Sequence, residues 1–165
     1  MERDGKAATY ERVLRDIDAT LEGETDLLAA MATVVCLLHQ AFDTYFWTGF
    51  YRRSGAAQLL VGPYQGSLGC LHIAFERGVC GACARSGQTI VVPDVHQFPG
   101  HIACDARSNS EIVVPVFNRA GQLIAVFDVD SEQYGAFDEV DRAGLEQIMA
   151  RLARFEPAPV VVTPR

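Results

Sequence analysis

The stretch EIVVPVFNRAGQLIAVFDVD, residues 111–130, decides how this chain folds. Two apolar runs flank residues 119–121, Arg-Ala-Gly, and a short glycine-containing link between such runs is typical of a β-hairpin. Successive side chains of a strand point to opposite faces, so Asp128 and Asp130 are expected on one face and Phe127 on the other, buried face. The stretch therefore predicts an antiparallel hairpin with one apolar face.

Outward from this hairpin, the spacing of apolar residues predicts elements on both sides. Helical spacing or a long apolar run predicts helices over residues 8–22 and 27–42, with Gly23 between them and Thr25 as the cap of the second helix. A glycine-bounded short helix is expected over residues 78–87, and an amphipathic helix capped by Asp138 closes the fold. Aromatic and β-branched runs predict further strands over residues 45–53, 58–64, 70–75 and 89–95.

The order of these elements predicts an α+β fold. Strands that follow one another through short links pair as antiparallel hairpins, and the helices are left to cover the faces of the sheet. We expect a single domain over residues 1–155, and a loose Pro-rich tail over residues 156–165.

Composition and charge limit the class of protein. The 165 residues carry a net charge of −7, and Lys6 is the only lysine, so a nucleic-acid partner is not expected. No apolar run reaches the ~20 residues that cross a bilayer, and the first residues lack the basic-then-apolar order of a secretion signal. We therefore expect a soluble protein of the cytoplasm without a membrane partner.

The five cysteines suggest thiol or metal chemistry. An odd number in a reducing compartment disfavours a structural disulfide framework. Cys36 lies inside the apolar helix and is interpreted as a small core residue. The cysteines that fall in or beside the strands and loops are the candidates for chemistry, namely Cys70, Cys80, Cys83 and Cys104.

Three interpretations of these cysteines remain open on spacing alone. Zinc could be held by two ligand pairs, one at positions 80 and 83 and one formed by His101 and Cys104. The sequence CGAC at residues 80–83 could be a thioredoxin-like dithiol, although the parallel βαβ context of that motif is missing. The third possibility is a nucleophilic cysteine with a separate recycling cysteine.

Acidic and aromatic residues indicate a small ligand. Glu111, Asp128 and Asp130 could attract a metal or an ammonium group, although paired acids on a strand are commonly just solvated. No glycine-rich phosphate loop accompanies them, which disfavours magnesium. Trp47 and Tyr51 are four apart on one strand face. An aromatic wall opposite carboxylates would hold a small molecule with a cationic and an apolar end.

Several motifs together resemble one enzyme family, from about Ala29 to Leu152. They are FWTGFY, LLVGPYQG, GVCG, DVHQFPGHIACDARSNSEIVVPV and LIAVFDVDS, of which HIACD combined with SNSEIVVP is the most specific. With these motifs the chain resembles the free methionine-(R)-sulfoxide reductases, which consist of a single GAF-type domain.

This resemblance implies a reaction and roles for the cysteines. The expected reaction converts free L-methionine (R)-sulfoxide to L-methionine, with thioredoxin as the electron donor and without a bound cofactor or metal. By position, Cys104 is expected to be the nucleophile and Cys70 the recycling cysteine, with Cys80 also able to pair. Cys83 departs from the family pattern, and we do not expect it to be catalytic.

The resemblance also implies the fold and the substrate pocket. It implies a GAF-like, six-stranded antiparallel sheet with helices on its faces, in a family that is often homodimeric. Glu111, Asp128 and Asp130 match the substrate-site carboxylates, and Trp47 and Tyr51 match the aromatic pocket. We favour Glu111 as the proton donor, because burial and neighbouring carboxylates raise the pKa of a carboxyl group.

Two further expectations concern the loops. Residues 62–69 and 97–107 are expected to be mobile lids, with His96 and His101 as loop-orienting residues. An alternative function is a GAF sensor module that binds a small ligand and has redox-responsive cysteines, and a zinc-structured protein is a third.

Overall fold

The structure of the chain is a computed structural model that describes residues 3–101 and 104–155. The tail expected to be loose, residues 156–165, lies outside the described residues. Within the described ranges, no helix has both the length and the hydropathy of a membrane span.

A six-stranded sheet forms the centre of the fold, and its neighbouring strands run antiparallel in the order β3-β2-β1-β6-β5-β4. The hairpin predicted from residues 111–130 is β5 and β6, and its turn is closed by the hydrogen bond that the Asn118 amide donates to the Gln122 carbonyl. This confirms the expected α+β class and the six-stranded antiparallel sheet. The strands are β1 (Trp47–Ser54), β2 (Gln58–Gln65), β3 (His72–Ala74), β4 (Ile90–Val92), β5 (Ser110–Phe117) and β6 (Leu123–Ser131).

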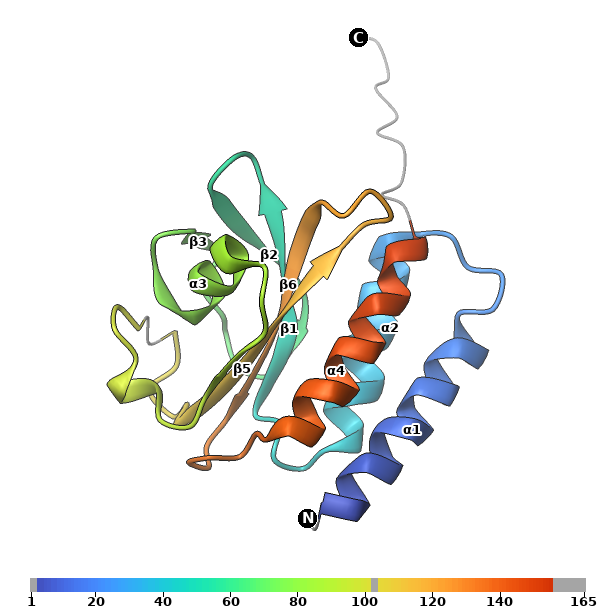
Figure 1. The fold of residues 1–165 in the computed structure, drawn as a ribbon, viewed down its shortest axis with the longest axis horizontal. Helices are drawn as coiled ribbons and strands as arrows, with labels where there is room; N and C mark the ends of the chain where they lie inside the picture. Colours follow the sequence, from blue (N-terminus) through green and yellow to red (C-terminus); the bar gives the residue numbers. More distant parts are fainter. Residues whose placement is uncertain (1–2, 102–103, 156–165) are drawn as a thin grey trace, which may run out of the picture.

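The helices divide between the two faces of the sheet. Figure 1 shows α1, α2 and α4 on one side of the sheet and the short α3 on the other. Short 3-10 turns follow β4 and α4, at Val95–Gln97 and Leu152–Arg154. The α-helices are α1 (Arg3–Thr20), α2 (Leu27–Ala41), α3 (Gly78–Ser86) and α4 (Glu139–Arg151).

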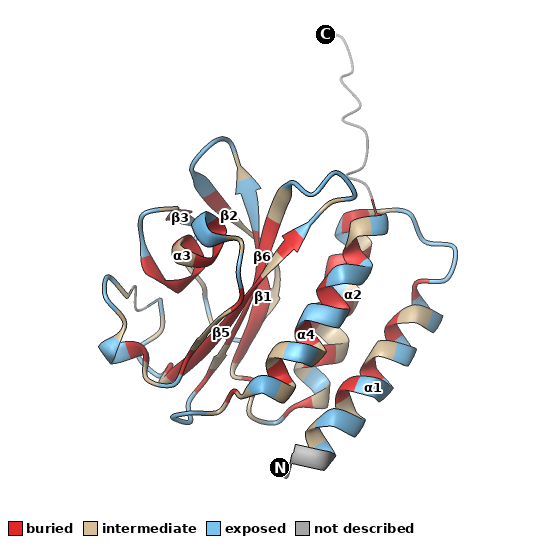
Figure 2. Ribbon diagram, viewed as in Figure 1, coloured by how far each residue is buried: buried red, intermediate tan, exposed pale blue. Residues whose placement is uncertain are grey.

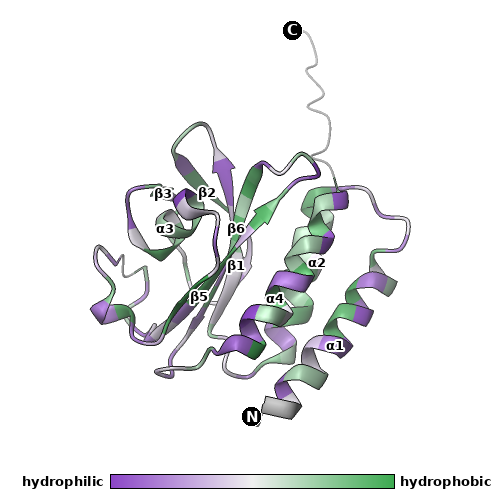
Figure 3. Cartoon of the chain, viewed as in Figure 1, coloured by the Kyte–Doolittle hydropathy of each residue, from purple (hydrophilic) through white to green (hydrophobic). Residues whose placement is uncertain are grey.

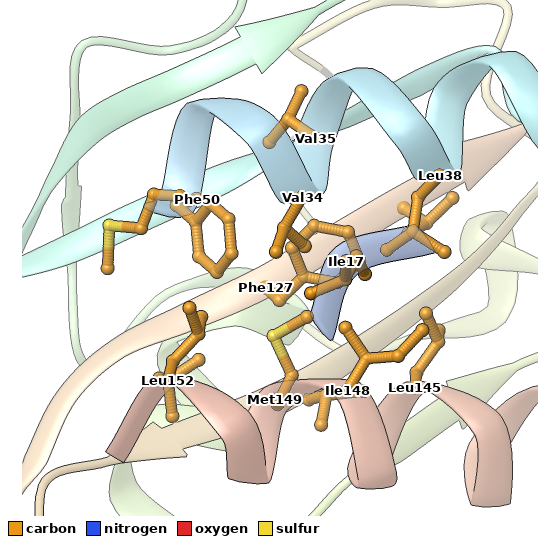
Figure 4. Packing of buried hydrophobic residues seen from close by; sticks show 14 of the residues in the cluster. Ile17, Val34, Val35, Leu38, Phe50, Phe127, Leu145, Ile148, Met149 and Leu152 are labelled. Atoms are coloured by element: carbon orange, nitrogen blue, oxygen red, sulfur yellow. The ribbon is translucent and has the colours of Figure 1, made fainter. Parts of the chain in front are cut away.

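The main core lies between the sheet and helices α2 and α4, and α1 packs on these two helices from the outside. Phe50 and Phe127 project from neighbouring strands with ring centroids 4.8 Å apart, and α2 and α4 bury their apolar stripes against this face of the sheet. Figure 4 shows Val34 and Leu38 from α2 facing the apolar side chains of α4 across this layer. Burial and hydropathy follow the same division, because the buried stripes of the helices turn toward the sheet (Figures 2 and 3).

The opposite face of the sheet has its own, smaller cluster. It joins Val113 and Val126 of the central hairpin to Val79 and Cys83 of α3. The same strands therefore supply two separate apolar layers, as their alternating side chains require. The candidate site residues named above lie on this second face or at its edge.

Some element boundaries differ from those predicted, for local reasons. Thr25 is not the cap of α2: the N-cap is Asp26, whose carboxylate accepts a hydrogen bond from the Ala29 amide at 2.7 Å. The strand predicted over residues 89–95 is only Ile90–Val92, because Pro93 has no N–H to continue the ladder and Asp94 caps the 3-10 turn that follows. Asp138 caps α4 as predicted.

The N-terminal helix α1 is attached through a buried polar network. The Lys6 ammonium lies 2.5 Å from a carboxylate oxygen of Asp141, and the Tyr10 hydroxyl donates a hydrogen bond to the same carboxylate at 2.8 Å. Tyr10 also shares a hydrogen bond with Tyr45, which precedes β1. Because Asp141 is paired on all sides, its burial at the start of α4 is compensated.

Truncation of a core residue on α4 tests the packing of the main core. Ile148 is fully buried, so Ile148→Ala should lower the free energy of unfolding by about 2–4 kcal/mol through lost burial and a cavity. Leu28 on α2 is 56% exposed, and Leu28→Ala is the matched control, with a loss below about 0.5 kcal/mol. Urea unfolding followed by circular dichroism measures both, and equal losses would contradict the assigned core.

Candidate active site

The register of three adjacent strands assembles the site. Trp47 of β1 lies opposite Asp130 of β6, which in turn lies opposite Glu111 of β5. One row further along, Gly49 lies opposite Asp128. Residues in register across a sheet share a face, so the three carboxylic acids and the tryptophan meet on the face opposite the main core. Sequence alternation predicted the shared face of the two aspartates, and the structure confirms it.

The aromatic wall requires glycine at position 49, because the ring of Trp47 occupies the space that a side chain there would need. The ring of Trp47 stacks between Tyr51 and Tyr64, with centroid separations of 5.5 and 5.3 Å. It covers Gly49, where a Cβ atom would lie 2.7 Å from the Trp47 ring and 2.4 Å from the Tyr64 Cβ. The Trp47 indole N–H donates to the Ser67 carbonyl at 3.1 Å, which fixes the ring at the edge of the loop that leads to Cys70.

A hollow opens above these strands, between the aromatic wall, α3 and the loop that carries Cys104. The space enclosed within it is about 40 Å³, and the volume is about 530 Å³ when all space between the atoms and the mouth open to solvent is counted. All the candidate site residues except Cys70 line it, namely Trp47, Tyr51, Cys80, Cys104, Glu111, Asp128 and Asp130.

Burial makes the three carboxylic acids hard to ionise. Desolvation, with Asp128 and Asp130 as neighbours, raises the pKa of Glu111 well above its ordinary value. Burial and Asp130 do the same to the pKa of Asp128. Burial raises the pKa of Asp130 to about 7, against a hydrogen bond from Ser108 that lowers it. At least one of these groups therefore keeps a proton near neutral pH.

Among the described residues, no lysine or arginine lines the hollow to neutralise these acids. His101 Nδ1 lies 4.0 Å from Glu111 Oε2, but burial lowers the pKa of His101, so its imidazole is neutral near pH 7. Asp128 Oδ1 is buried and has no hydrogen-bond partner among the described residues. The hollow thus presents an unpaired acceptor and excess negative potential, which suit a ligand with an ammonium group.

Cys104 is joined to Cys70 by a disulfide at the mouth of the hollow, across 34 residues of sequence. Their Cα atoms are 5.5 Å apart. Cys70 lies in the loop between β2 and β3, and Cys104 is exposed in the loop before β5. The two thiols can therefore reach each other, and the structure is that of the oxidised chain.

The remaining cysteines are free thiols with different surroundings. Cys80 of α3 is buried, and desolvation together with Asp128 raises the pKa of its thiol well above the ordinary value. Cys83 is fully buried, and its thiol donates to the Val113 carbonyl at 3.6 Å. Cys36 is half-buried and accepts from the Gln40 amide, so the prediction that it belongs to the core is wrong.

The zinc set suggested by sequence spacing is not assembled. Cys83 is bonded to the backbone of β5, and Cys104 is in a disulfide. A different trio could reach one ion, since the ligand atoms of Cys80, Glu111 and Asp128 lie within 4.8 Å of one another. A cation there would have to displace the protons that these buried groups hold, and the function proposed below uses those protons.

The structure adds pocket residues that sequence reasoning did not assign to the pocket. Phe46, which precedes Trp47, and Ser108, which is buried beside Asp130, both line the hollow. Both lie in motifs quoted above, but strand alternation could not place them because each lies just outside a strand. His101 was predicted to orient its loop, and the structure places it beside Glu111.

Comparison with known proteins agrees with this geometry. Residues 22–155 match the GAF domain family. The free methionine-R-sulfoxide reductase of Escherichia coli K12 is 42% identical over 149 residues, which cover 90% of this chain and 89% of that protein. This chain belongs to the GAF-domain family, in the branch of the free methionine-R-sulfoxide reductases.

Two further relatives extend this assignment. The GAF domain-containing protein A of Dictyostelium discoideum is 42% identical over 147 residues, or 89% of this chain and 92% of that protein. An X-ray structure of the free methionine-R-sulfoxide reductase of Neisseria meningitidis, in complex with its substrate, has 44% identity and a TM-score of 0.85. The alignment covers 90% of this chain and 88% of that chain. The GAF domain match begins after α1, so this helix is outside the matched family core.

A methyl group at position 49 tests the aromatic wall of this reductase family member. Gly49→Ala should displace the Trp47 ring, because the added Cβ would overlap both Trp47 and Tyr64. Trp47 is the only tryptophan of the chain, so its fluorescence reports the change directly. We expect a shift of the emission maximum to longer wavelength with unchanged far-UV circular dichroism. An unchanged emission spectrum would mean that the ring does not cover Gly49.

Proposed function

We propose that this chain reduces free L-methionine (R)-sulfoxide to L-methionine and that Cys104 is the nucleophile. The observation that carries the proposal is the convergence of Cys104, an aromatic wall and three buried carboxylic acids on one hollow. A disulfide already joins Cys104 to a second cysteine, which fits a redox cycle rather than a permanent structural role.

In the first step, the Cys104 thiolate attacks the sulfur of the sulfoxide. The sulfoxide oxygen takes up one proton and is transferred to Cys104, which becomes a sulfenic acid, while the substrate sulfur loses its oxygen and methionine is released. The substrate sulfur is reduced by two electrons and the Cys104 sulfur is oxidised by two. The step needs an acid at the substrate oxygen, because none of the described residues around the hollow is a lysine or arginine that could stabilise a developing oxyanion.

Glu111 is the proposed proton donor. Its pKa is raised by burial and by two neighbouring carboxyl groups, so the proton is available near neutral pH. Asp128 and Asp130 bind the ammonium group of the substrate. Asp128 Oδ1, which is buried and has no hydrogen-bond partner among the described residues, accepts a hydrogen bond from that group. Trp47 and Tyr51 pack against the apolar part of the substrate.

Selectivity for the free amino acid follows from the same charges. Methionine sulfoxide inside a polypeptide has no free ammonium group, so it would leave the buried acids unpaired. A site whose buried polar groups lose their partners rejects the wrong ligand by about 10⁴-fold. The (S) epimer presents its oxygen away from the acid when its other groups are bound in the same way.

Regeneration uses Cys70. Its thiol condenses with the Cys104 sulfenic acid, a disulfide forms and water leaves. A dithiol protein of the thioredoxin class then reduces the disulfide by exchange, in keeping with a reducing cytoplasm. Cys80 is a reserve partner only, because its thiol is buried and its raised pKa leaves little thiolate. The catalytic cycle needs no bound cofactor or metal.

The direct test is an NADPH-coupled assay with thioredoxin, thioredoxin reductase and each epimer separately. We expect turnover with free methionine (R)-sulfoxide and at least about 100-fold less with the (S) epimer or with sulfoxide in a peptide. Binding of the (R) epimer without turnover would instead support the sensor hypothesis. Equal rates on both epimers would exclude the proposed pocket geometry.

The pH profile tests the acid. We expect kcat of the (R)-sulfoxide reaction to fall on the alkaline side as the donor loses its proton, with a midpoint well above the ordinary carboxyl pKa of about 4. Asp130→Asn removes a charge that raises the pKa of Glu111, so the alkaline midpoint should move to lower pH. An unchanged alkaline midpoint would show that the charge of Asp130 does not raise the pKa of the proton donor.

The roles of the two cysteines are separable by single-turnover measurements. Cys104→Ser should abolish methionine formation even at one equivalent of substrate, because the nucleophile is lost. Cys70→Ser should form about one equivalent of methionine and then stop or slow at least about tenfold, because recycling by thioredoxin is impaired. Full turnover by Cys104→Ser would show that Cys104 is not the nucleophile, and Cys80 would then be the first thiol to test.

A further inference from the structure

Two loops that carry the redox cysteines are joined by a hydrogen bond at the base of the disulfide. The Ser67 hydroxyl donates to Asp105 Oδ2 at 2.7 Å. Ser67 lies three residues before Cys70, and Asp105 directly follows Cys104. Among the hydrogen bonds of the described residues, this one spans the same two segments as the disulfide.

Each side of this hydrogen bond is held in place by further contacts. Asp105 receives three hydrogen bonds from Arg107, from its backbone N–H, its Nε and its Nη2, at 2.9 to 3.1 Å. The Arg107 guanidinium stacks on the ring of Phe46 at 4.3 Å, and it lies 3.7 Å from Glu132. The hydrogen bonds from Arg107, together with that from Ser67, hold the pKa of Asp105 below its usual range, so Asp105 accepts as a carboxylate.

Ser67 is anchored to the wall of the pocket. Its carbonyl accepts the Trp47 indole N–H, so the backbone of the Cys70 loop is fixed to β1. The adjacent Gly66 has φ +118° and would place a Cβ 2.7 Å from the Phe46 carbonyl, so the turn into this loop requires glycine. The two cysteine loops therefore approach each other over a common aromatic base, formed by Phe46 and Trp47.

We propose that the Ser67–Asp105 hydrogen bond is a clasp that positions Cys70 for attack on the oxidised Cys104, with Ser67 as a positioning residue. The clasp rests on the proposed function, and it belongs to the regeneration step rather than to sulfoxide reduction. In that step the Cys70 thiol and the Cys104 sulfenic acid give a disulfide and water. Loop closure between distant residues costs entropy, and a clasp beside the sulfur atoms raises their effective concentration.

The clasp would allow disulfide formation to proceed faster than over-oxidation of Cys104. A sulfenic acid that waits for its partner can be oxidised further, whereas a thiol held nearby reacts first. Sulfoxide reduction itself needs only Cys104 and the pocket. The clasp therefore predicts a separation of two rates that a general loss of structure would not produce.

The experiment compares Ser67→Ala with Ser67→Thr, which keeps a hydroxyl, and with the control Ser86→Ala on α3, whose hydroxyl bonds to the Cys83 carbonyl. Fully reduced protein is mixed with one equivalent of free methionine (R)-sulfoxide and quenched by alkylation at successive times. Released methionine gives the first rate, and mass spectrometry of the Cys70–Cys104 disulfide gives the second. Dimedone traps the sulfenic acid that remains.

For Ser67→Ala we expect unchanged methionine release, disulfide formation slowed about tenfold and more dimedone adduct on Cys104. Ser67→Thr should restore the rate of disulfide formation, and Ser86→Ala should match the wild type. Unchanged disulfide formation in Ser67→Ala would overturn the clasp. Equal slowing of both rates would also overturn it, because that result indicates a structural role only.

An equilibrium measurement tests the clasp without any substrate. Titration against reduced and oxidised glutathione gives the equilibrium constant of the Cys70–Cys104 disulfide. We expect Ser67→Ala to lower this constant about tenfold, and Asp105→Ala combined with Ser67→Ala to lose no more than Asp105→Ala alone. An unchanged constant, or fully additive losses, would contradict the clasp. Failure of turnover with an altered constant would count against the proposed function only.

Discussion

The burial of three carboxylic acids, with no lysine or arginine beside them in the part of the chain that the structure describes, is the constraint on which the rest of this site depends. Glu111, Asp128 and Asp130 share one face of the central sheet and line the same hollow. Such groups cannot all ionise, since each charge raises the cost of the next in a desolvated space. The hollow must keep a proton, accept a cationic ligand, or do both. A zwitterionic substrate whose oxygen needs a proton satisfies both requirements at once.

The fold can bury these acids because the two faces of the sheet have different roles: one carries the main apolar core, and the other carries the site. Phe50, Phe127 and the helices α1, α2 and α4 form the apolar layer that supplies most of the burial. The opposite face can then hold polar groups whose ionisation would cost free energy, because the stability of the fold does not depend on that face alone. Cys104, the proposed nucleophile, lies outside the sheet, in a loop at the mouth of the hollow. The oxidation state of the Cys104 sulfur can therefore change without rearrangement of either apolar core.

Much of this was predictable from the sequence, because it depends on local patterns. Alternation within β6 placed Asp128 and Asp130 on one face, and the glycine turn at residues 119–121 predicted that β5 and β6 pair. The contact of the aromatic wall with the acids was not predictable locally, since β1 pairs with β6, far along the chain. Thr25 and Asp26 are both good caps, and only the structure distinguishes them. The family motifs supplied the pocket assignments that spacing left open.

The central claim is that a carboxyl group in the hollow retains its proton near neutral pH. Its most direct test is an NMR titration of the side-chain carboxyl carbons in protein labelled with carbon-13 at aspartate and glutamate, assigned through Glu111→Gln, Asp128→Asn and Asp130→Asn. We predict that at least one of these three carboxyl groups titrates with a midpoint near pH 7 or above. If all three titrate near the ordinary value of about 4, the account is contradicted.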